Sequence, residues 1–301
     1  MAIIRHPQHP QRDLPFAEYH ADDYGLFPAQ SRRILDCADK GVLNSISIIP
    51  NSPHLAECMR ALAPYRGCLT AAVHLNFMEG KALCPGILSN DIGNFRVSFG
   101  MLLLHSFLPD RDRYRSALRE EIRAQIHAVA PYLTEKPLHI DGHAHYHMIP
   151  VIFDALMDVI QEDGLLVSYI RVPREFLRIY LRHWRTLEGF RGINLVKVLV
   201  LNTLARRNTR KYKYFFSKLE RRVFLGVLFS GNMCFQNVSA VLPEAKALAK
   251  RKGWGVEVLA HPGGVYEKSD IAQLTHREDI AFLTSRLRQK EAEMFHILYN
   301  G

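Results

Sequence analysis

The sequence has few cysteines and lacks long apolar runs. Its five cysteines among 301 residues are odd in number and form no C-x-x-C pair, which excludes a disulfide-stapled miniprotein and favours reduced thiols in a cytosolic chain. No stretch approaches the roughly 18 consecutive apolar residues of a membrane span. The first 16 residues carry prolines and charges where a signal peptide needs an apolar segment, so we expect no export.

Internal repeats and low-complexity tracts are also missing, which excludes fibrous and disordered classes. With 48% hydrophobic and 23% charged residues, the composition is that of a globular protein. The length allows one large α/β domain or two smaller ones, and we expect a single domain over residues 1–301.

Acidic residues are scarce in one segment only. Residues 171–222 contain 15 Lys or Arg and 3 Asp or Glu. The rest of the chain contains 24 Lys or Arg and 27 Asp or Glu. The net charge of +9 therefore comes from one basic segment in an otherwise mildly acidic protein. This contrast predicts an anionic partner at one place.

Short apolar runs typical of buried strands alternate with helical patterns along the chain. Helical periodicity covers residues 30–40, 113–132 and 152–161. The alternation predicts a parallel sheet of about seven strands, either closed as a (β/α) barrel or open and doubly wound. The expected strands are 16–20, 45–49, 70–75, 138–141, 169–172 and 256–260, with a weaker candidate at 233–238.

Polar residues follow four of these strands, which is where a barrel carries its functional residues. Each cluster alone has an ordinary explanation. The Asp pair at 22–23 could cap a helix, His74 could be a hydrogen-bonded core residue, and Pro-Gly at 262–263 could form a turn. Four of them at corresponding positions predict a metal site instead. The clusters are H-A-D-D-Y-G at 20–25, H-L-N at 74–76, D-G-H-A-H-Y-H at 141–147 and H-P-G-G at 261–264.

The chemistry that such a set supports is metal-assisted hydrolysis. One Asp and two His can hold a divalent ion and leave positions for water and substrate. The ion acidifies its bound water and polarises a carbonyl, while a second carboxylate accepts a proton and a His opposite protonates the leaving nitrogen. If residues 143–147 are extended, His143, His145 and His147 share one face and look into one cavity.

In this order, the motifs A-D-D-Y-G, H-L-N, D-G-H-x-H-x-H-M and H-P-G-G resemble those of the YdjC-like carbohydrate deacetylases. N-S-I-S-I-I-P-N-S-P, E-G-K-A-L and Y-I-R-V-P-R-E add to the similarity, which covers most of residues 16–175 and returns at 254–264. The resemblance implies an irregular (β/α) barrel related to polysaccharide deacetylases. It also implies removal of N-acetyl groups from amino sugars with one bound divalent ion.

Residue roles follow from the resemblance by position. Asp22 would be the general base, His261 the general acid, and Arg171 would orient or pair with Asp22. The family points to Mg²⁺, and a ligand set with two imidazoles suits Zn²⁺ as well. One departure is His20, which stands where the family commonly has Asn before A-D-D. The implied metal ligands are Asp23, His74 and His143, and the candidate substrate-binding residues are Tyr24, Asn76, His145, His147 and Arg174.

The basic segment, residues 176–231, is expected to be a helical insert in the barrel. It interleaves arginines with large apolar residues, which is typical of a helix on an anionic membrane surface. A helical lid packed on the barrel, with solvated arginines outside, explains the pattern equally well. Some enzymes similar to this family act on polyprenyl-phosphate-linked N-acetylhexosamine, a step in lipopolysaccharide modification. A membrane role would therefore suggest a lipid-linked amino-sugar substrate.

We expect a cytoplasmic protein, and the membrane interpretation would place it at the inner face of the cytoplasmic membrane. A homodimer is compatible with the sequence. Two other function classes stay open. One is a metal-dependent phosphoesterase or amidohydrolase on a related barrel. The other is a nucleic-acid-binding module that uses the basic segment, although this explains neither the carboxylates nor the histidines at the strand ends.

Overall fold

The computed structural model describes residues 16–133 and 137–300, and its centre is a seven-stranded sheet of parallel strands. The strand order is β5-β4-β3-β2-β1-β7-β6. The chain therefore starts in the middle of the sheet, builds outward to one edge, and ends with two strands on the other side of β1. The strands are β1 (Ala17–Tyr24), β2 (Ser45–Ile48), β3 (Thr70–Leu75), β4 (Leu138–Gly142), β5 (Val167–Ile170), β6 (Arg222–Leu225) and β7 (Gly255–Ala260).

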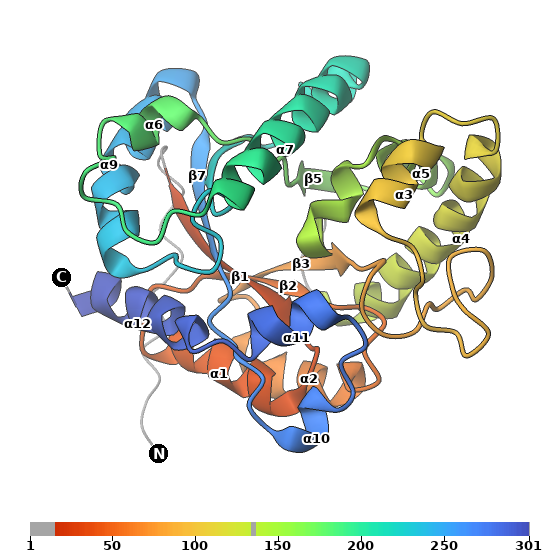
Figure 1. The fold of residues 1–301 in the computed structure, drawn as a ribbon, viewed down its shortest axis with the longest axis horizontal. Coiled ribbons are helices and arrows are strands. Elements are labelled where there is room, and N and C mark those ends of the chain that lie inside the picture. Colours follow the sequence, from red (N-terminus) through yellow and green to blue (C-terminus); the bar gives the residue numbers. More distant parts are fainter. Residues whose placement is uncertain (1–15, 134–136, 301) are drawn as a thin grey trace.

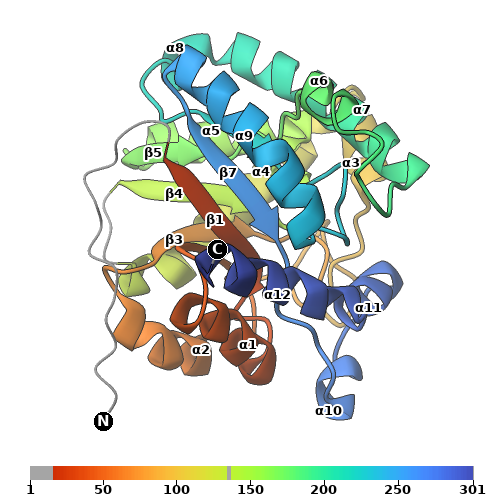
Figure 2. The ribbon, with the colours of Figure 1, turned by 90° about the vertical axis from the view of Figure 1, so that its left-hand side faces the viewer.

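The two edge strands approach each other because the sheet is strongly curled (Figure 2). The backbone N–H of Glu220, just before β6, donates to the carbonyl oxygen of Ser168 in β5 at 2.8 Å. The guanidinium of Arg222 lies 3.7 Å from the ring centroid of Tyr169. A parallel sheet curled this far forms an incompletely closed (β/α) barrel, which confirms the expected fold class.

Most of the expected strands are confirmed to within two residues, and two differ. The first strand continues to Tyr24, so the Asp pair lies inside it. The expected strand at 233–238 is wrong, because Phe235 begins the helix α9 (Phe235–Lys252) and the buried Val238, Val241 and Leu242 follow helical spacing. The missing strand is β6, a run of only four buried residues within the basic segment.

Helices cover the outside of the curled sheet (Figure 1). The first begins with Pro at its first turn, where the missing N–H costs nothing. The expected helices at 30–40, 113–132 and 152–161 correspond to α1, α4 and α5. Besides α9, the helices are α1 (Pro28–Asp39), α2 (Leu55–Leu62), α3 (Phe99–His105), α4 (Arg111–Val129), α5 (Pro150–Glu162), α6 (Leu177–Leu181), α7 (Gly192–Lys211), α8 (Lys213–Phe216), α10 (Lys268–Ile271), α11 (Arg277–Leu283) and α12 (Leu287–Asn300).

One buried carboxylate of α5 holds the end of α7 on the barrel. Asp154 has no exposed side-chain surface and binds Arg207 and Lys211 of α7 at 2.9 Å each, with the hydroxyl of Tyr212 donating at 2.7 Å. The amide of Asn208 donates to the carbonyl oxygen of Met148 at 2.8 Å, which ties α7 to the histidine-rich turn after β4. The end of α7 therefore packs on the barrel, which is the arrangement that the lid interpretation predicts.

The outer face of α7 has a different character at its two ends. Its first half exposes Ile193, Val196 and Leu199, each more than half accessible, and its last turns expose Arg206 and Arg210. Among the described helices, none combines the length and apolar character needed to cross a bilayer. The expectation about residues 1–15 concerns a stretch outside the described part of the chain.

Candidate active site

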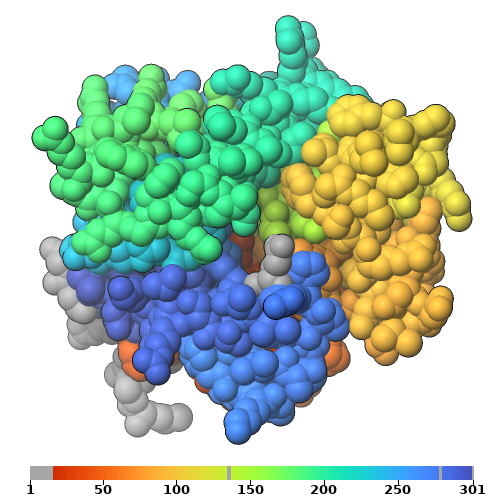
Figure 3. All heavy atoms as spheres, viewed as in Figure 1, coloured from red at the N-terminus to blue at the C-terminus, as the bar shows by residue number. Residues whose placement is uncertain are grey.

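The polar residues that follow the strands converge at the carboxyl ends of β1, β3, β4 and β7. Seen from this side, the molecule is hollowed near its centre, between the segments of α3, α7 and α11 (Figure 3). Figure 2 shows the arrowheads of β4 and β7 on the same side of the molecule. A parallel barrel brings the ends of all its strands to one face, so residues more than 200 positions apart meet there.

Asp23, His74 and His143 form the tightest group at this face. One ligand atom from each lies within 4.8 Å of the other two, and all three side chains are buried. The Nδ1 atom of His143 is 2.8 Å from Oδ1 of Asp23, and Nε2 of His74 is 3.3 Å from the same oxygen. The other Asp23 oxygen, Oδ2, and Nε2 of His74 are buried without a hydrogen-bond partner. A bound metal ion would satisfy buried ligand atoms that have no hydrogen-bond partner.

A break in β1 lets two consecutive aspartates reach the same cavity. Neighbouring side chains of a regular strand point to opposite faces. Here the pairing of β1 with β2 shifts register between Ala21 and Tyr24, and Asp23 has a positive φ of 67°. Left-handed backbone in a residue other than Gly costs free energy and concentrates at functional sites. The shift keeps Asp22 and Asp23 together around the same group of histidines.

Asp141 fixes the orientation of His74. Its Oδ1 lies 2.6 Å from His74 Nδ1, so Nε2 of the imidazole faces Asp23. Its Oδ2 binds Ser47 and lies 2.8 Å from Nη2 of Arg171. Burial would raise the pKa of Asp141, but Arg171 and His74 lower it to about 2. A carboxylate behind a ligating imidazole sets the tautomer and increases its basicity.

Asp22 is held as a carboxylate by Arg171. One guanidinium nitrogen, Nη1, donates to both carboxylate oxygens at 2.9 Å. Burial opposes ionisation, yet Arg171 and His74 hold the pKa of Asp22 well below its ordinary value. The same positive charge that keeps Asp22 ionised also makes it a weak base, so the proton it accepts has to come from an acidified water.

His261 approaches the cluster from the end of β7. Its Nε2 is 3.9 Å from Asp22 Oδ2, and its ring meets the ring of Phe282 edge-on with centroids 4.9 Å apart. Its backbone N–H donates to Glu291 at 2.7 Å. Burial lowers the pKa of His261, although Asp23 and Asp22 oppose that shift. An imidazole beside the cluster, with some solvent access, has the position of a proton donor.

The expected extended run of histidines is wrong. Residues His143–Met148 form 3₁₀ turns interrupted by a kink, where Ala144 and His145 have left-handed φ of 46° and 59°. His143 therefore reaches Asp23, whereas His147 turns inward and its Nε2 bonds the carbonyl oxygen of Arg171 at 2.9 Å. Burial lowers the pKa of His147 to about 4, which makes it a neutral internal support. His145 lies partly exposed against the ring of Phe224, with a buried unbonded Nδ1.

Three other candidates for substrate contact lie elsewhere. The hydroxyl of Tyr24 donates to the carbonyl oxygen of Cys58 at 2.7 Å. The amide of Asn76 bonds the backbone of Met78 and Glu79 and so shapes its own loop. The guanidinium of Arg174 lies over Phe176, 5.1 Å from the ring centroid. The structure does not bring these side chains to the cluster.

A layer of buried charged residues beneath the cluster has no role in the sequence-based prediction. Glu257 of β7 is fully buried, binds Nε of Arg171 at 2.7 Å and accepts from the hydroxyl of Tyr169. Glu18 of β1 binds Arg222, and His20 lies 3.3 Å from Asp22. Acidic residues in the middle of apolar strands were the available signal, since buried carboxylates need charged partners.

Fold and site together define a (β/α) barrel with a buried Asp-His-His cluster beside a second Asp and a further His. A profile of the YdjC-like protein family matches residues 19–296, and the chain belongs to this family. A carbohydrate deacetylase of Xenopus laevis is 28% identical over 177 residues, 57% of this chain and 56% of that protein. A carbohydrate deacetylase of Danio rerio is 25% identical over 234 residues, which are 73% of this chain and 68% of that protein. The match thus spans a little over half the length of the Xenopus relative.

Among solved structures, a candidate cellobiose-phosphate cleavage protein of Enterococcus faecalis superposes with a TM-score of 0.56. It is 15% identical, and the match covers 94% of this chain and 95% of that one. At this identity the likeness concerns the fold.

Proposed function

We propose that the protein is a metal-dependent hydrolase that removes the N-acetyl group from an amino sugar. The observation that carries the proposal is the group of Asp23, His74 and His143, with two unbonded buried ligand atoms, directly beside Asp22 and His261. Membership of the YdjC-like family and similarity to proteins named carbohydrate deacetylase support it.

The residues fit a single divalent ion. Asp23 Oδ2 and His74 Nε2 are free donor atoms, and an Asp-His-His set leaves further positions open. The ligand chemistry admits Zn²⁺ and also Mg²⁺, the ion to which the family resemblance points. When bound, the ion would supply an acidified water and polarise the acetyl carbonyl. Two other acidic and histidine groups nearby share His20, but Arg171 and Arg222 already neutralise their carboxylates. The described residues therefore favour a one-metal site over the two metals common in phosphoesterases.

The side chains divide the proton transfers between them. Asp22 takes a proton from the attacking water, and Arg171 holds that carboxylate in place and ionised. Water adds to the carbonyl carbon, the C–N bond breaks, and His261 in its protonated form gives a proton to the departing nitrogen. The products are acetate and a free amine. Lowering the pKa of His261 makes its imidazolium a stronger acid for this step.

The proposal extends to the substrate: the amino sugar is linked to a lipid, and the protein reaches it on an anionic membrane surface. The support is the outer face of α7, which begins apolar at Ile193 and ends basic at Arg210. The α3 segment lies across the hollow from α7 (Figure 3), and α3 and the loop after it expose the apolar side chains of Leu104 and Phe107. Apolar and basic side chains on one surface are the combination that binds an anionic lipid interface.

Acetate release tests the proposed reaction. Purified protein of known metal content is incubated with a panel of N-acetylated sugars, free and polyprenyl-phosphate-linked, and mass spectrometry follows the loss of one acetyl group. Metal removal by a chelator should abolish the reaction, and adding the ion back should restore it. Release of phosphate from phosphorylated sugars, without acetate from any of the panel, would instead identify a phosphoesterase.

A further inference from the structure

The imidazole of His261, the proposed proton donor, is not oriented by a hydrogen bond. Within residues 16–133 and 137–300, neither of its ring nitrogens has a hydrogen-bond partner, and the carboxylates of Asp22 and Glu291 approach Nε2 and Nδ1 only to 3.9 Å. By contrast, Nδ1 of His74 and Nδ1 of His143 each bond a carboxylate, at 2.6 and 2.8 Å. A proton donor has to point its N–H at the leaving atom, so another contact must set the orientation of this ring.

Phe282 of α11 makes the contact that can fix the ring of His261. The two rings meet edge-on, with centroids 4.9 Å apart and an angle of 88° between their planes. Perpendicular aromatic pairs at this separation are favourable, and rotation of the imidazole about its Cβ–Cγ bond would change the angle. Packing against Phe282 therefore takes the place of the hydrogen bond that orients the other imidazoles.

Phe282 is itself held by the buried pair of Arg288 and Glu291. The guanidinium of Arg288 lies over the Phe282 ring, 4.0 Å from its centroid, and Glu291 neutralises it at 3.1 Å. Both charged side chains are fully buried, and a desolvated cation over an aromatic ring is held more tightly than an exposed one. Glu291 also accepts from the backbone N–H of His261 at 2.7 Å. One carboxylate therefore fixes His261 at its backbone and, through two further side chains, at its ring.

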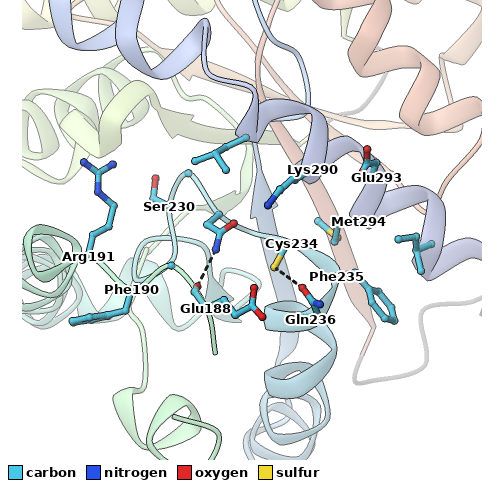
Figure 4. Close-up of a pocket in the computed structure, with 15 residues that line it drawn as sticks. Glu188, Phe190, Arg191, Ser230, Cys234, Phe235, Gln236, Lys290, Glu293 and Met294 are labelled. Carbon is cyan, nitrogen blue, oxygen red and sulfur yellow. Dashed lines mark hydrogen bonds between the residues drawn. The ribbon is translucent and has the colours of Figure 1, made fainter. Parts of the chain in front are cut away.

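The helix α12, which carries Arg288 and Glu291, has a second face with a different environment. Lys290, Glu293 and Met294 line a separate cavity of about 730 Å³ between α12, the loop before α7 and the loop after β6 (Figure 4). Arg288 and Glu291 do not line this cavity. The contacts behind His261 are therefore made by closely packed side chains, which packing keeps in fixed rotamers.

The start of α11 is anchored by Glu79, a residue of the E-G-K-A-L motif that takes no part in the proposed reaction. Its buried carboxylate accepts from the hydroxyl of Thr275 at 2.7 Å and from the backbone N–H of His276 at 3.0 Å. His276 immediately precedes α11. Glu79 therefore fixes the helix that carries Phe282, at the border of the hollow (Figure 3).

We propose that Phe282 is a positioning residue for the proton donor, because its ring sets the orientation in which the His261 imidazole faces the leaving nitrogen. Arg288 holds the ring of Phe282, and Glu79 holds its helix. The inference rests on the proposed function for the role of His261. It assigns a function to a residue of the C-terminal third that none of the sequence motifs contains.

The dependence of the reaction on its leaving group tests this assignment. Departure of an amine needs a proton from His261, whereas p-nitrophenyl acetate releases p-nitrophenolate as an anion and needs none. Both reactions use the same attacking water and the same base. In Phe282→Leu we therefore expect kcat for an N-acetylated sugar to fall about 10- to 100-fold, part of the usual contribution of a general acid, and kcat for the ester to fall less than about threefold. The KM for the sugar should stay unchanged.

Matched variants separate orientation of the proton donor from general destabilisation. Phe282→Tyr keeps the aromatic ring and should keep the wild-type ratio of amide to ester hydrolysis. Glu79→Gln should lower this ratio, as Phe282→Leu does. Its control is Glu121→Gln, because the buried Glu121 also accepts from backbone N–H groups, those of Leu83 and Cys84 at 3.1 and 2.7 Å, but holds its loop against α4. This control should leave the ratio unchanged.

NMR of protein labelled with ¹³C-histidine tests the ring contact without turnover, with His261→Ala to assign the signals. The His261 ring protons should shift in Phe282→Leu, because the ring current of Phe282 is lost. Equal losses of amide and ester hydrolysis in Phe282→Leu, or unchanged hydrolysis of both, would overturn the inference and leave the deacetylase proposal standing. If the wild type releases acetate from no sugar, the proposed function is wrong, and the NMR signals alone decide whether Phe282 holds the ring.

Discussion

Arg171 and Asp22 form a buried two-point contact, with one guanidinium nitrogen 2.9 Å from each carboxylate oxygen. The remaining nitrogens of Arg171 bind Glu257 and Asp141, so one cation serves three carboxylates inside the barrel. Asp22 can therefore lose its charge without leaving Arg171 unpaired. This makes the proposed base unusually suitable for a conservative substitution.

Asp22→Asn should keep the metal and lose turnover. The amide can still accept one hydrogen bond from Arg171 but cannot take a proton from water. We expect kcat to fall by about 10²- to 10⁴-fold, the usual contribution of a general base. Kinetics of acetate release and metal analysis on the same sample check this. Asp23→Asn is the matched control, because it should lose the metal together with activity. Full activity of Asp22→Asn would contradict the assignment of the base.

Asp141→Asn should weaken the metal site without touching its ligands. Asp141 bonds Nδ1 of His74 at 2.6 Å, and losing the carboxylate removes the charge that orients and polarises this imidazole. Substitutions at such supporting carboxylates typically cost about 10- to 100-fold in metal affinity. Titration with Zn²⁺ followed by calorimetry measures the effect. Activity at saturating metal should recover in large part, whereas unchanged affinity would show that His74 does not bind the ion.

Asp154→Asn should loosen α7 and lower stability. Asp154 is buried with Arg207, Lys211 and Tyr212 around it, and charge-assisted hydrogen bonds of this kind are worth about 1.5–3 kcal/mol. Arg207 and Lys211 are about a third or more exposed, so solvent screening places the loss at the lower end of this range. Thermal unfolding checks it, with Asp158→Asn as the control, since Asp158 pairs with Arg115 nearer the surface.

The effect of Asp154→Asn should depend on pH. Burial would raise the pKa of Asp154, but Arg207, Tyr212 and Lys211 hold it below its ordinary value. A carboxyl group with a depressed pKa contributes stability above the pKa of the unfolded chain and loses it as the pH falls toward the native pKa. The difference in unfolding free energy between wild type and Asp154→Asn should therefore be constant near neutral pH and shrink below about pH 4. A difference that grows on acidification would contradict this account.

Membrane binding should depend on the basic end of α7. Reversing Arg206 and Arg210 to Glu should release the protein from vesicles containing anionic lipid, because each basic residue near such a surface contributes about 1 kcal/mol. Arg207 is left intact, since it binds Asp154 and holds the helix in place. Sedimentation with vesicles at low salt measures the effect. The control reverses the exposed Lys250 and Arg251 of α9. Failure of the wild type to sediment would remove the support for a lipid-linked substrate.

Much of the candidate site could be predicted from the sequence because its residues follow strands of a parallel barrel. The family resemblance implied Asp23, His74 and His143 as ligands, and the structure places one ligand atom of each within 4.8 Å of the other two. The backbone break at Asp23 could not be predicted, since positive φ in an aspartate leaves no composition signal. The 3₁₀ turn at 143–148 was also missed, because alternating His residues match a strand pattern equally well.

The errors in the fold have a common physical cause. A short strand is recognised by a run of apolar residues, and β6 has only Val223, Phe224 and Leu225 after a buried Arg222. That arginine can be buried because Glu18 of β1, on the other side of the neighbouring strand β7, neutralises it. An ion pair between residues about 200 positions apart leaves no signal in a local sequence pattern. The strand was therefore predicted at residues 233–238, which also contain apolar residues.

The position of β1 in the middle of the sheet has a consequence for synthesis of the chain. All three proposed ligands and the base have been synthesised by residue 143, but one edge of β1 stays unpaired until β7 is made more than a hundred residues later. An open strand edge next to a cluster of carboxylates and imidazoles invites aggregation and premature ion capture by the nascent polypeptide. Chaperone demand, and not only catalysis, should therefore be sensitive to how quickly the C-terminal third is completed.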